Sequence, residues 1–244
     1  MRTYGQYCPI ARTAELLAER WTIVILRNIL VGCQTFNEIA DGAPDLSRGL
    51  LSKRLRELER AGIIEIRPKP DGHGSTYEPT QAGRELSELM LALERWGRKW
   101  AELKPEHAHP GVVLWVWANF FLDRDRLPRR RVVVRFEYPT LAASARRSWL
   151  LIERGDAEYC LKHPGGQEEL IVVVNDPLAF ARWHMGQIQW RDALRSGAIE
   201  VKGSPALARA LPRWNRHGWA ADDPRAGYDG STQHQPATTV AATT

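Results

Sequence analysis

The segment from Ser47 to Gly62 constrains the fold most, because its apolar and basic residues would lie on opposite faces of a helix. With about 100° between successive residues, Leu51, Leu55 and Leu58 share one face. The opposite face carries Gly49, Ser52, Lys53, Arg56 and Arg60, and the complete basic run is Arg48, Lys53, Arg54, Arg56 and Arg60. Ser47 is a suitable N-cap and Gly62 a suitable stop. The pattern predicts a helix that packs on one side and presents cations on the other.

Positive charge gathers around this segment. Residues 47–70 contain seven Lys or Arg and three Glu, a local net charge of +4, while the 244 residues together carry a formal net charge of +5. An isoelectric point of about 9.3 favours an anionic partner, nucleic acid first and an acidic membrane second. A solvated charged face is the alternative interpretation of such a run.

Further elements around the basic helix are typical of a winged helix-turn-helix. Residues 10–18 and 21–31 have helical apolar spacing, and Thr35 with Glu38 fits a capping box at the start of a third helix. A turn precedes the basic helix, which gives helix-turn-helix order. Behind it, residues 63–68 and 75–79 are predicted to pair as a hairpin across a Gly-rich turn, and this wing would bring cations to phosphates.

The residues predicted to contact double-stranded DNA are Ser47, Arg48, Ser52, Lys53, Arg56, Arg60, Arg67 and Lys69. Lys53 and Arg56 are candidates for base edges or phosphates, since Arg can hold guanine O6 and N7 with two hydrogen bonds. The residues near the helix start lie where backbone N–H groups also attract phosphate.

A long helix with an apolar seam is expected after Thr80. The seam residues repeat with spacings of three and four, as in a coiled coil: Leu86, Leu89, Leu93, Trp96, Trp100 and Leu103. Such a seam predicts a homodimer interface formed with a second copy of the helix. Packing of the seam on its own domain is the alternative.

The chain changes character after a Pro- and His-containing linker near residues 105–110. Strands are predicted at 131–138, 148–153, 158–161, 170–174 and 199–202, and helices start after Asp176 and Ser204. The expected fold class is therefore α+β, with an N-terminal winged helix-turn-helix domain at 1–104 and a C-terminal α+β domain with an antiparallel sheet at 111–221. Residues 222–244 are expected to be a disordered tail.

Five motifs follow one another between residues 7 and 103. They are Cys8-Pro9-Ile10; Glu19-Arg20-Trp21-Thr22 with Ile25-Leu26-Arg27; Phe36-Asn37-Glu38-Ile39; Leu50-Leu51-Ser52-Lys53-Arg54-Leu55-Arg56-Glu57-Leu58; and Tyr77-Glu78-Pro79-Thr80-Gln81-Ala82-Gly83. As a set they resemble the HxlR family of bacterial winged-helix transcription regulators. The resemblance implies a dimer that binds a dyad operator. Pro79 departs from the family pattern, in which an apolar residue usually precedes the Thr.

The second half is similar to the sterol carrier protein type of domain, through Asp176-Pro177-Leu178-Ala179-Phe180, residues 190–197 and residues 199–214. That resemblance implies an apolar pocket and a hydrophobic small-molecule effector. The aromatic residues that could line such a pocket are Trp115, Trp117, Phe120, Trp149, Trp183 and Trp190. Ordinary core packing is the alternative role for these side chains.

Cysteine usage predicts a reducing, cytoplasmic setting. The three cysteines, Cys8, Cys33 and Cys160, are odd in number and widely spaced, which argues against a disulfide framework. No apolar run is long enough to cross a bilayer, so no membrane partner is expected. Cysteine at the position of Cys8 acts as an oxidation sensor in several HxlR-like regulators, and a purely structural cysteine is the alternative.

Catalytic and metal-binding motifs are not found in the sequence. His107 and His109 are two residues apart without a nearby cysteine, and His184 lies in an apolar stretch, so no metal site is predicted. GxSxG, Walker, GxGxxG and HExxH patterns do not occur, which argues against an enzyme and against a cofactor. The favoured hypothesis is a dimeric, DNA-binding repressor. The alternatives are a hydrophobic-ligand carrier whose helical half is a docking platform, and a redox switch through Cys8.

Overall fold

The computed structural model describes residues 3–69, 73–142 and 146–216. The chain divides into two compact units, with the boundary between Gly97 and Arg98. The tail predicted at 222–244 lies outside the described residues. No helix in the described ranges combines the length and the apolar character needed to cross a membrane.

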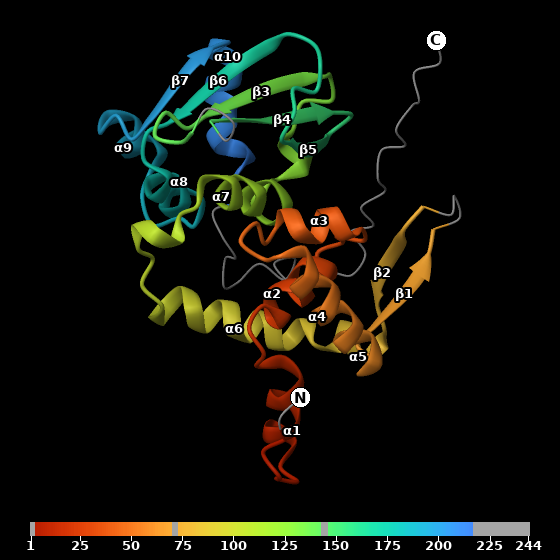
Figure 1. Ribbon diagram of the computed structural model, residues 1–244. Coiled ribbons are helices and arrows are strands. Elements are labelled where there is room, and N and C mark those ends of the chain that lie inside the picture. The colour runs from red at the N-terminus through yellow and green to blue at the C-terminus, as the bar shows by residue number, and fades with distance from the viewer. Residues whose placement is uncertain (1–2, 70–72, 143–145, 217–244) are drawn as a thin grey trace. The chain divides into compact units, whose positions relative to one another are not determined.

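The first unit contains the predicted helices and hairpin in the predicted order (Figure 1). Its elements are α1 (Pro9–Leu17), α2 (Thr22–Leu30), α3 (Phe36–Asp41), α4 (Arg48–Arg60), β1 (Ile64–Pro68), β2 (Ser75–Pro79), α5 (Gln81–Glu85) and α6 (Ser87–Trp100). The capping box of α3 is confirmed, because Thr35 Oγ1 accepts from Glu38 N while Glu38 accepts from Thr35 N. This unit is the winged helix-turn-helix that the sequence predicted.

The core of this unit joins α2, α3 and α4. Ile25, Ile39 and Leu51 are fully buried. Asn28 is also fully buried, and its Nδ2 donates to the Ile39 carbonyl oxygen at 2.9 Å, which satisfies a polar group that would otherwise oppose folding. The basic helix α4 therefore rests on a platform formed by the two preceding helices.

The single long helix expected after Thr80 is in fact two helices, α5 and α6, separated at Leu86. Ser87 Oγ donates to the Arg84 carbonyl oxygen at 2.6 Å, and Leu86 N donates to the Gly83 carbonyl oxygen at 3.2 Å. Such side-chain and short-range bonds compete with the regular helical pattern. The seam residue Leu86 thus lies at a break, while the rest of the seam lies on α6 or beyond it.

The second unit is an α+β domain built on a five-stranded sheet. Its strands are β3 (Val132–Glu137), β4 (Arg147–Glu153), β5 (Asp156–Cys160), β6 (Glu168–Val174) and β7 (Ile199–Gly203), in the spatial order β5-β4-β3-β6-β7. All neighbouring pairs are antiparallel except the central pair β3 and β6, which is parallel. The sheet is thus mixed, because the chain leaves the edge strand β5 and returns to the middle of the sheet.

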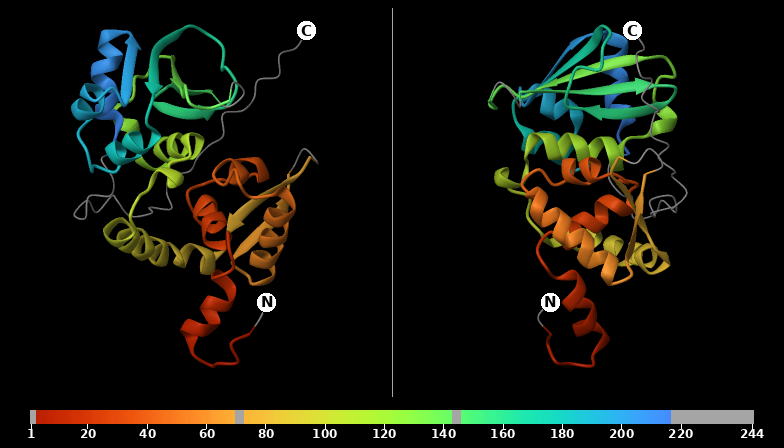
Figure 2. Two further views of the ribbon diagram at one scale, coloured as in Figure 1. Left: turned by 60° about the vertical axis from the view of Figure 1, so that its left-hand side comes forward. Right: turned by 45° about the vertical axis from the view of Figure 1, so that its right-hand side comes forward.

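Helices cover one side of this sheet (Figure 2). They are α7 (Pro110–Val116), α8 (Pro177–His184), α9 (Trp190–Arg195) and α10 (Pro205–Ala210), with short turns η1 (Pro105–His107), η2 (Trp117–Phe121), η3 (Arg124–Arg126) and η4 (Leu211–Trp214). Helix α7 is followed directly by the π-helical turn η2, in which Trp117 Nε1 donates to the buried Asn215 Oδ1 at 3.1 Å.

Candidate nucleic-acid interface

Helix α4 is fixed at both of its ends. Ser47 Oγ accepts a hydrogen bond from Leu50 N at 3.3 Å, which confirms the N-cap. At the other end Gly62 has φ +71°, and Ile63 N donates to the Leu58 carbonyl oxygen at 3.0 Å, so the predicted stop is confirmed as well. The apolar side is fully buried and consists of Leu51, Leu55 and Leu58. The opposite side of the helix is thereby held outward.

The outward side of α4 is exposed and cationic. Arg56 and Arg60 are exposed, and Arg60 Nε donates to the Arg56 carbonyl oxygen at 3.2 Å. Lys53 Nζ lies 3.9 Å from Glu57 Oε1, with the lysine side chain 61% exposed. Ser52 is half-buried beside them. These cations can approach an anionic ligand without first leaving a buried partner.

Arg48 occupies a different environment at the start of the helix. Its Nη2 donates to Asn37 Oδ1 at 2.7 Å, and its guanidinium carbon lies 5.0 Å from the centre of the Phe36 ring. Arg48 therefore joins α4 to α3. This contact adds a polar link to the apolar packing between the two helices of the helix-turn-helix.

Arg54, a member of the basic run, points into the unit instead of outward. Its side chain is 8% exposed and forms ion pairs with Glu19 at 2.7 Å and Glu57 at 2.6 Å. Its Nε donates to the Arg20 carbonyl oxygen at 3.2 Å, next to Trp21, which has the left-handed φ of +78°. A buried guanidinium with three acceptors anchors α4 to the turn before α2. Arg54 is therefore a positioning residue.

The wing carries less free positive charge than its sequence suggests. Arg67 Nη2 lies 2.6 Å from Glu65 Oε2, and Arg67 Nη1 lies 3.4 Å from Glu78 Oε2. The hydrogen bond with Glu65 raises the pKa of Arg67, with a further contribution from Glu78. Lys69 is half-buried, and its backbone N donates to the Gly74 carbonyl oxygen. Contact between Arg67 and a phosphate would have to compete with two carboxylates.

The wing is joined to α5 by a close backbone approach. Thr80 Oγ1 donates to the Gly62 carbonyl oxygen at 2.7 Å and accepts from Gly83 N at 3.1 Å. A Cβ on Gly83 would lie 2.1 Å from the carbonyl oxygen of Ile63. Only glycine allows this contact, which explains the Thr-Gln-Ala-Gly motif in physical terms.

Helix α6 presents an apolar stripe to solvent. The exposed fractions are 37% for Leu89, 42% for Leu93, 63% for Trp96 and 65% for Trp100. Large apolar side chains in this number on one helix are costly to hydrate. Four of the six predicted seam residues thus form an exposed apolar stripe, while Leu86 and Leu103 are half-buried.

The six aromatic residues predicted to line a ligand pocket have different surroundings in the described residues, and the pocket stays a prediction of the sequence. Trp117 and Trp183 are fully buried and pack edge-on against Phe180, at ring-centre distances of 5.7 and 5.2 Å. Trp190 packs on Trp183 at 4.5 Å, and Trp115 contacts Phe120. The contacts of Trp117, Trp183 and Trp190 lie in or against the core between helices and sheet, which is the alternative role that the sequence analysis named.

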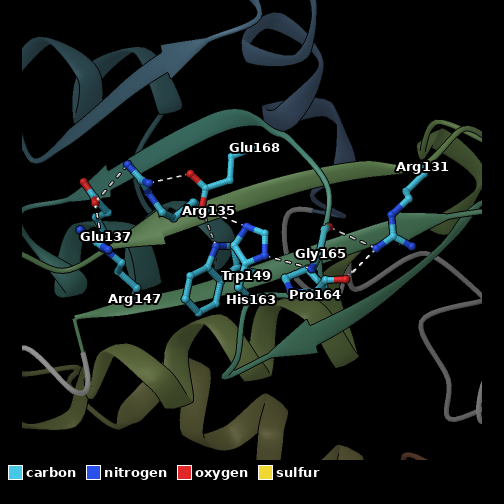
Figure 3. Close-up of polar contacts among 9 residues, drawn as sticks. All are labelled: Arg131, Arg135, Glu137, Arg147, Trp149, His163, Pro164, Gly165 and Glu168. Carbon is cyan, nitrogen blue, oxygen red and sulfur yellow. Dashed lines mark hydrogen bonds and ion pairs between the residues drawn. The ribbon is translucent and has the colours of Figure 1, made fainter. Parts of the chain in front are cut away.

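Trp149 lies on the other face of the sheet. Along β4 the buried residues are Ser148, Leu150 and Ile152, so Trp149 must point away from the helices. Its Nε1 donates to Glu168 Oε1 at 2.9 Å, and Glu168 also accepts from Arg135 Nη1 at 2.6 Å, as Figure 3 shows. Trp149 therefore belongs to a polar network on the open face and not to an apolar pocket.

The cysteines and histidines have contrasting environments. Burial raises the pKa of the Cys33 thiol to about 12, and burial raises that of Cys160 to about 11, so neither is poised to react. Cys8 is half-buried at the start of α1. Burial, with a contribution from Arg98, lowers the pKa of His184 to about 3. Within the described ranges, no group of three or more His, Cys, Asp or Glu residues could hold a metal ion.

Comparison with known proteins relates the first unit to one family. The model of the HxlR-like helix-turn-helix family matches residues 16–105. The HTH-type transcriptional regulator sll1512 of Synechocystis is 34% identical over 104 residues, which are 40% of this chain and 73% of that protein. YvaP, an HTH-type transcriptional regulator of Bacillus subtilis, is 30% identical over 100 residues, which are 40% of this chain and 93% of its own length.

Among solved structures, the reduced form of the transcriptional regulator YodB from B. subtilis is 29% identical. The match covers 40% of this chain and 97% of YodB, with a TM-score of 0.35. The two curated relatives are both named as regulators of transcription, and the match to each spans most of that relative's length. This chain therefore belongs to the HxlR-like helix-turn-helix family of transcriptional regulators.

Proposed function

We propose that the protein is a sequence-specific transcriptional regulator that binds a two-fold symmetric operator as a homodimer. The single observation that carries the proposal is the outward side of α4, where Lys53, Arg56 and Arg60 are exposed while the leucines behind them are buried. A helix with this asymmetry fits the major groove, and its exposed cations neutralise phosphates or contact base edges.

The remaining predicted contacts divide into two groups. Ser47 and Ser52 flank the N-terminal turn of α4, where backbone N–H groups favour phosphate. Arg48 would act mainly by holding α3 against α4, because its guanidinium is already bonded to Asn37. Arg67 and Lys69 would contribute weaker phosphate contacts from the wing, since the charge of Arg67 is balanced by two glutamates.

The exposed stripe on α6 supports the homodimer. In a dimer, Leu89, Leu93, Trp96 and Trp100 would pack on the same residues of the second copy and lose contact with water. Two more apolar side chains are exposed near the start of α1, Tyr7 at 99% and Ile10 at 80%. The dimer would set two α4 helices about one helical turn of DNA apart, ~34 Å.

Repression is the proposed outcome, because a dimer bound across a promoter blocks access of the transcription machinery to it. The cytoplasm is the proposed location. The second unit, with its resemblance to a sterol carrier domain, is proposed as the effector domain. Trp117 and Trp183 are buried in the core and Phe120 and Trp190 pack against it, so the carrier alternative has less support than the regulator. Redox sensing through Cys8 stays a prediction of the sequence.

The test is selection of bound fragments from sheared DNA of the source organism by the full chain, followed by gel-shift competition. The proposal expects a retained fragment with an inverted repeat that resists a thousandfold excess of random DNA. Equal competition by random DNA for every fragment would refute sequence-specific binding.

A further inference from the structure

Net positive charge resides in the second unit and not in the helix-turn-helix unit. Residues 1–97 contain 13 Lys or Arg and 13 Asp or Glu, so the unit that carries α4 is neutral overall. Residues 98–216 contain 20 Lys or Arg and 13 Asp or Glu, a net charge of +7. Long-range attraction of a polyanion depends on such a net charge. The unit with no assigned contact to DNA therefore has the larger attraction for it.

Six arginines of the second unit gather where β3 begins and where β4 turns into β5. We call them the arginine cluster: Arg124, Arg126, Arg129, Arg130, Arg131 and Arg154. Three contacts bring them together. Arg154 N donates to the Arg129 carbonyl oxygen at 3.0 Å, Arg124 Nε donates to Asp156 Oδ1 at 2.8 Å, and Arg131 Nη1 lies 3.6 Å from Glu153 Oε2.

Four members of the cluster are already paired with carboxylates. Arg124 pairs with Asp156, Arg126 with Asp123, Arg130 with Glu169 and Arg131 with Glu153. Arg129 and Arg154 are exposed, and neither forms an ion pair with any residue in the part of the chain that the structure describes. These two guanidiniums, on adjacent backbone segments, are therefore available to an anionic partner.

Arg154 also stands at a strained position. It has φ +57° and precedes Gly155 at φ +84° in the two-residue turn between β4 and β5. Asn, Asp or Gly are the residues that such a turn favours, and a longer L side chain is strained there. An arginine at a turn position that favours Asn, Asp or Gly suggests that its positive charge has a function.

We propose that the arginine cluster, led by Arg129 and Arg154, is a second phosphate-binding surface that holds the DNA backbone without reading its sequence. The proposal rests on the proposed function in that the polyanion is DNA. It adds that nonspecific affinity and its salt dependence come largely from the second unit, while α4 supplies preference among sequences. Guanidinium groups suit this role because each can donate two hydrogen bonds to one phosphate.

The experiment uses the full chain and the double variant Arg129→Ser/Arg154→Asn, in which the second substitution also relieves the strained turn. Binding to a 30-base-pair random duplex and to a selected operator is followed by fluorescence anisotropy from about 50 to 200 mM salt. The expected result is roughly tenfold weaker binding to both duplexes at low salt. The slope of log affinity against log salt should become shallower by about 2, because each lost phosphate contact removes about 0.9.

Three controls make the outcome specific. Arg154→Lys keeps the charge and should retain most of the affinity. Arg195→Ser removes an exposed arginine that is paired with Asp192 outside the cluster, and should leave the slope unchanged. The far-ultraviolet circular dichroism of the double variant should match that of the parent and its thermal midpoint should be no lower, which shows that any loss of binding is not unfolding.

Unchanged affinity and slope in the double variant would overturn the proposal. It would equally be overturned if the substitutions abolished binding to vesicles of phosphatidylglycerol while DNA binding stayed the same, since the cluster would then serve a membrane. Failure of the proposed function looks different: the parent chain would show no preference for any fragment, whereas the cluster substitutions would still weaken binding to random DNA.

Discussion

Arg54 Nη2 donates to Glu19 Oε2 at 2.7 Å and so ties the middle of α4 to the turn before α2, 35 residues earlier in the chain. The arginine side chain is 8% exposed, whereas Glu19 is 46% exposed. The two partners therefore differ. Without Arg54, Glu19 can be hydrated, but the carbonyl oxygen of Arg20 loses the hydrogen bond that Arg54 Nε donates to it.

Replacing Arg54 by Ala should lower the free energy of unfolding by about 2 to 4 kcal/mol, because a buried, multiply bonded guanidinium is lost. Replacing Glu19 by Gln should cost less than about 1 kcal/mol, since that carboxylate is half in water. Urea unfolding of both variants measures the difference. Arg60→Ala is the exposed control on the same helix, and an equal effect of Arg54→Ala and Arg60→Ala would contradict the positioning role.

Gly83→Ala should destabilise the first unit by about 3 kcal/mol or more, because its Cβ would lie 2.1 Å from the Ile63 carbonyl oxygen and force two backbone segments apart. Gly97→Ala is the matched control in α6. A Cβ there has no heavy atom within 4 Å, and alanine should stabilise the helix by about 0.5 to 1 kcal/mol. Thermal unfolding of the two variants in parallel should give shifts of the thermal midpoint with opposite signs. Two shifts of the same sign would contradict the steric role of Gly83.

Leu93→Glu combined with Trp96→Ala should convert a dimer into a monomer. The two side chains are 42% and 63% exposed in the single chain, and the substitutions remove the apolar contacts that they would make with the second copy. Sedimentation velocity measures the change. Glu88→Gln, a change on the same helix that keeps its apolar stripe, should leave the dimer intact. A parent chain that sediments as a monomer at micromolar concentration would rule out the α6 interface.

The free energy of unfolding should fall as the pH is lowered from about 6.5, because His184 stays neutral in the folded protein while it becomes protonated in the unfolded chain. Burial lowers its folded pKa to about 3, while an unfolded histidine titrates near about 6.5. Between these values the unfolded chain binds a proton that the folded chain does not, so this group's stabilisation is complete above about pH 6.5 and is lost toward pH 3. Its contribution changes by at most about 1.4 kcal/mol per pH unit.

Unfolding by urea at pH 7, 6 and 5 tests this expectation. His184→Gln should flatten the dependence over that range, because glutamine does not titrate. Phe121 and Phe180 pack against the His184 ring, and Arg98 adds to the lowering of its pKa. The substitution therefore also changes the packing of this site, which lowers stability at every pH. A variant with the same pH dependence as the parent would assign the effect to other groups.

Much of the first unit could be predicted because its signals are local. The capping box at Thr35, the cap at Ser47 and the stop at Gly62 each depend on residues within one turn. The burial of Arg54 was also within reach, since position 54 falls beside Leu51 and Leu58 on the helical wheel and not among the outward residues. Its acceptor Glu19, however, is far away in sequence.

The second unit was predicted less completely because its decisive contacts are distant in sequence. The strands and the α+β class follow from local patterns, but the parallel pairing of β3 with β6 depends on where the chain returns. The two sides of β4 are both partly apolar, with Leu150 on one and Trp149 on the other, so alternation alone could not say which side faced the helices. Trp117, in the π turn, has its hydrogen-bond partner Asn215 far along the chain.

The central claim is that Arg56 on the outward side of α4 discriminates among DNA sequences. The most direct measurement is the affinity of Arg56→Ala for the selected operator and for random DNA, beside Lys69→Ala from the wing and Arg195→Ala as the exposed control. Arg56→Ala should lose about 1 to 3 kcal/mol on the operator and much less on random DNA, while Lys69→Ala should weaken both alike. Equal losses on the two DNAs for Arg56→Ala would contradict the claim.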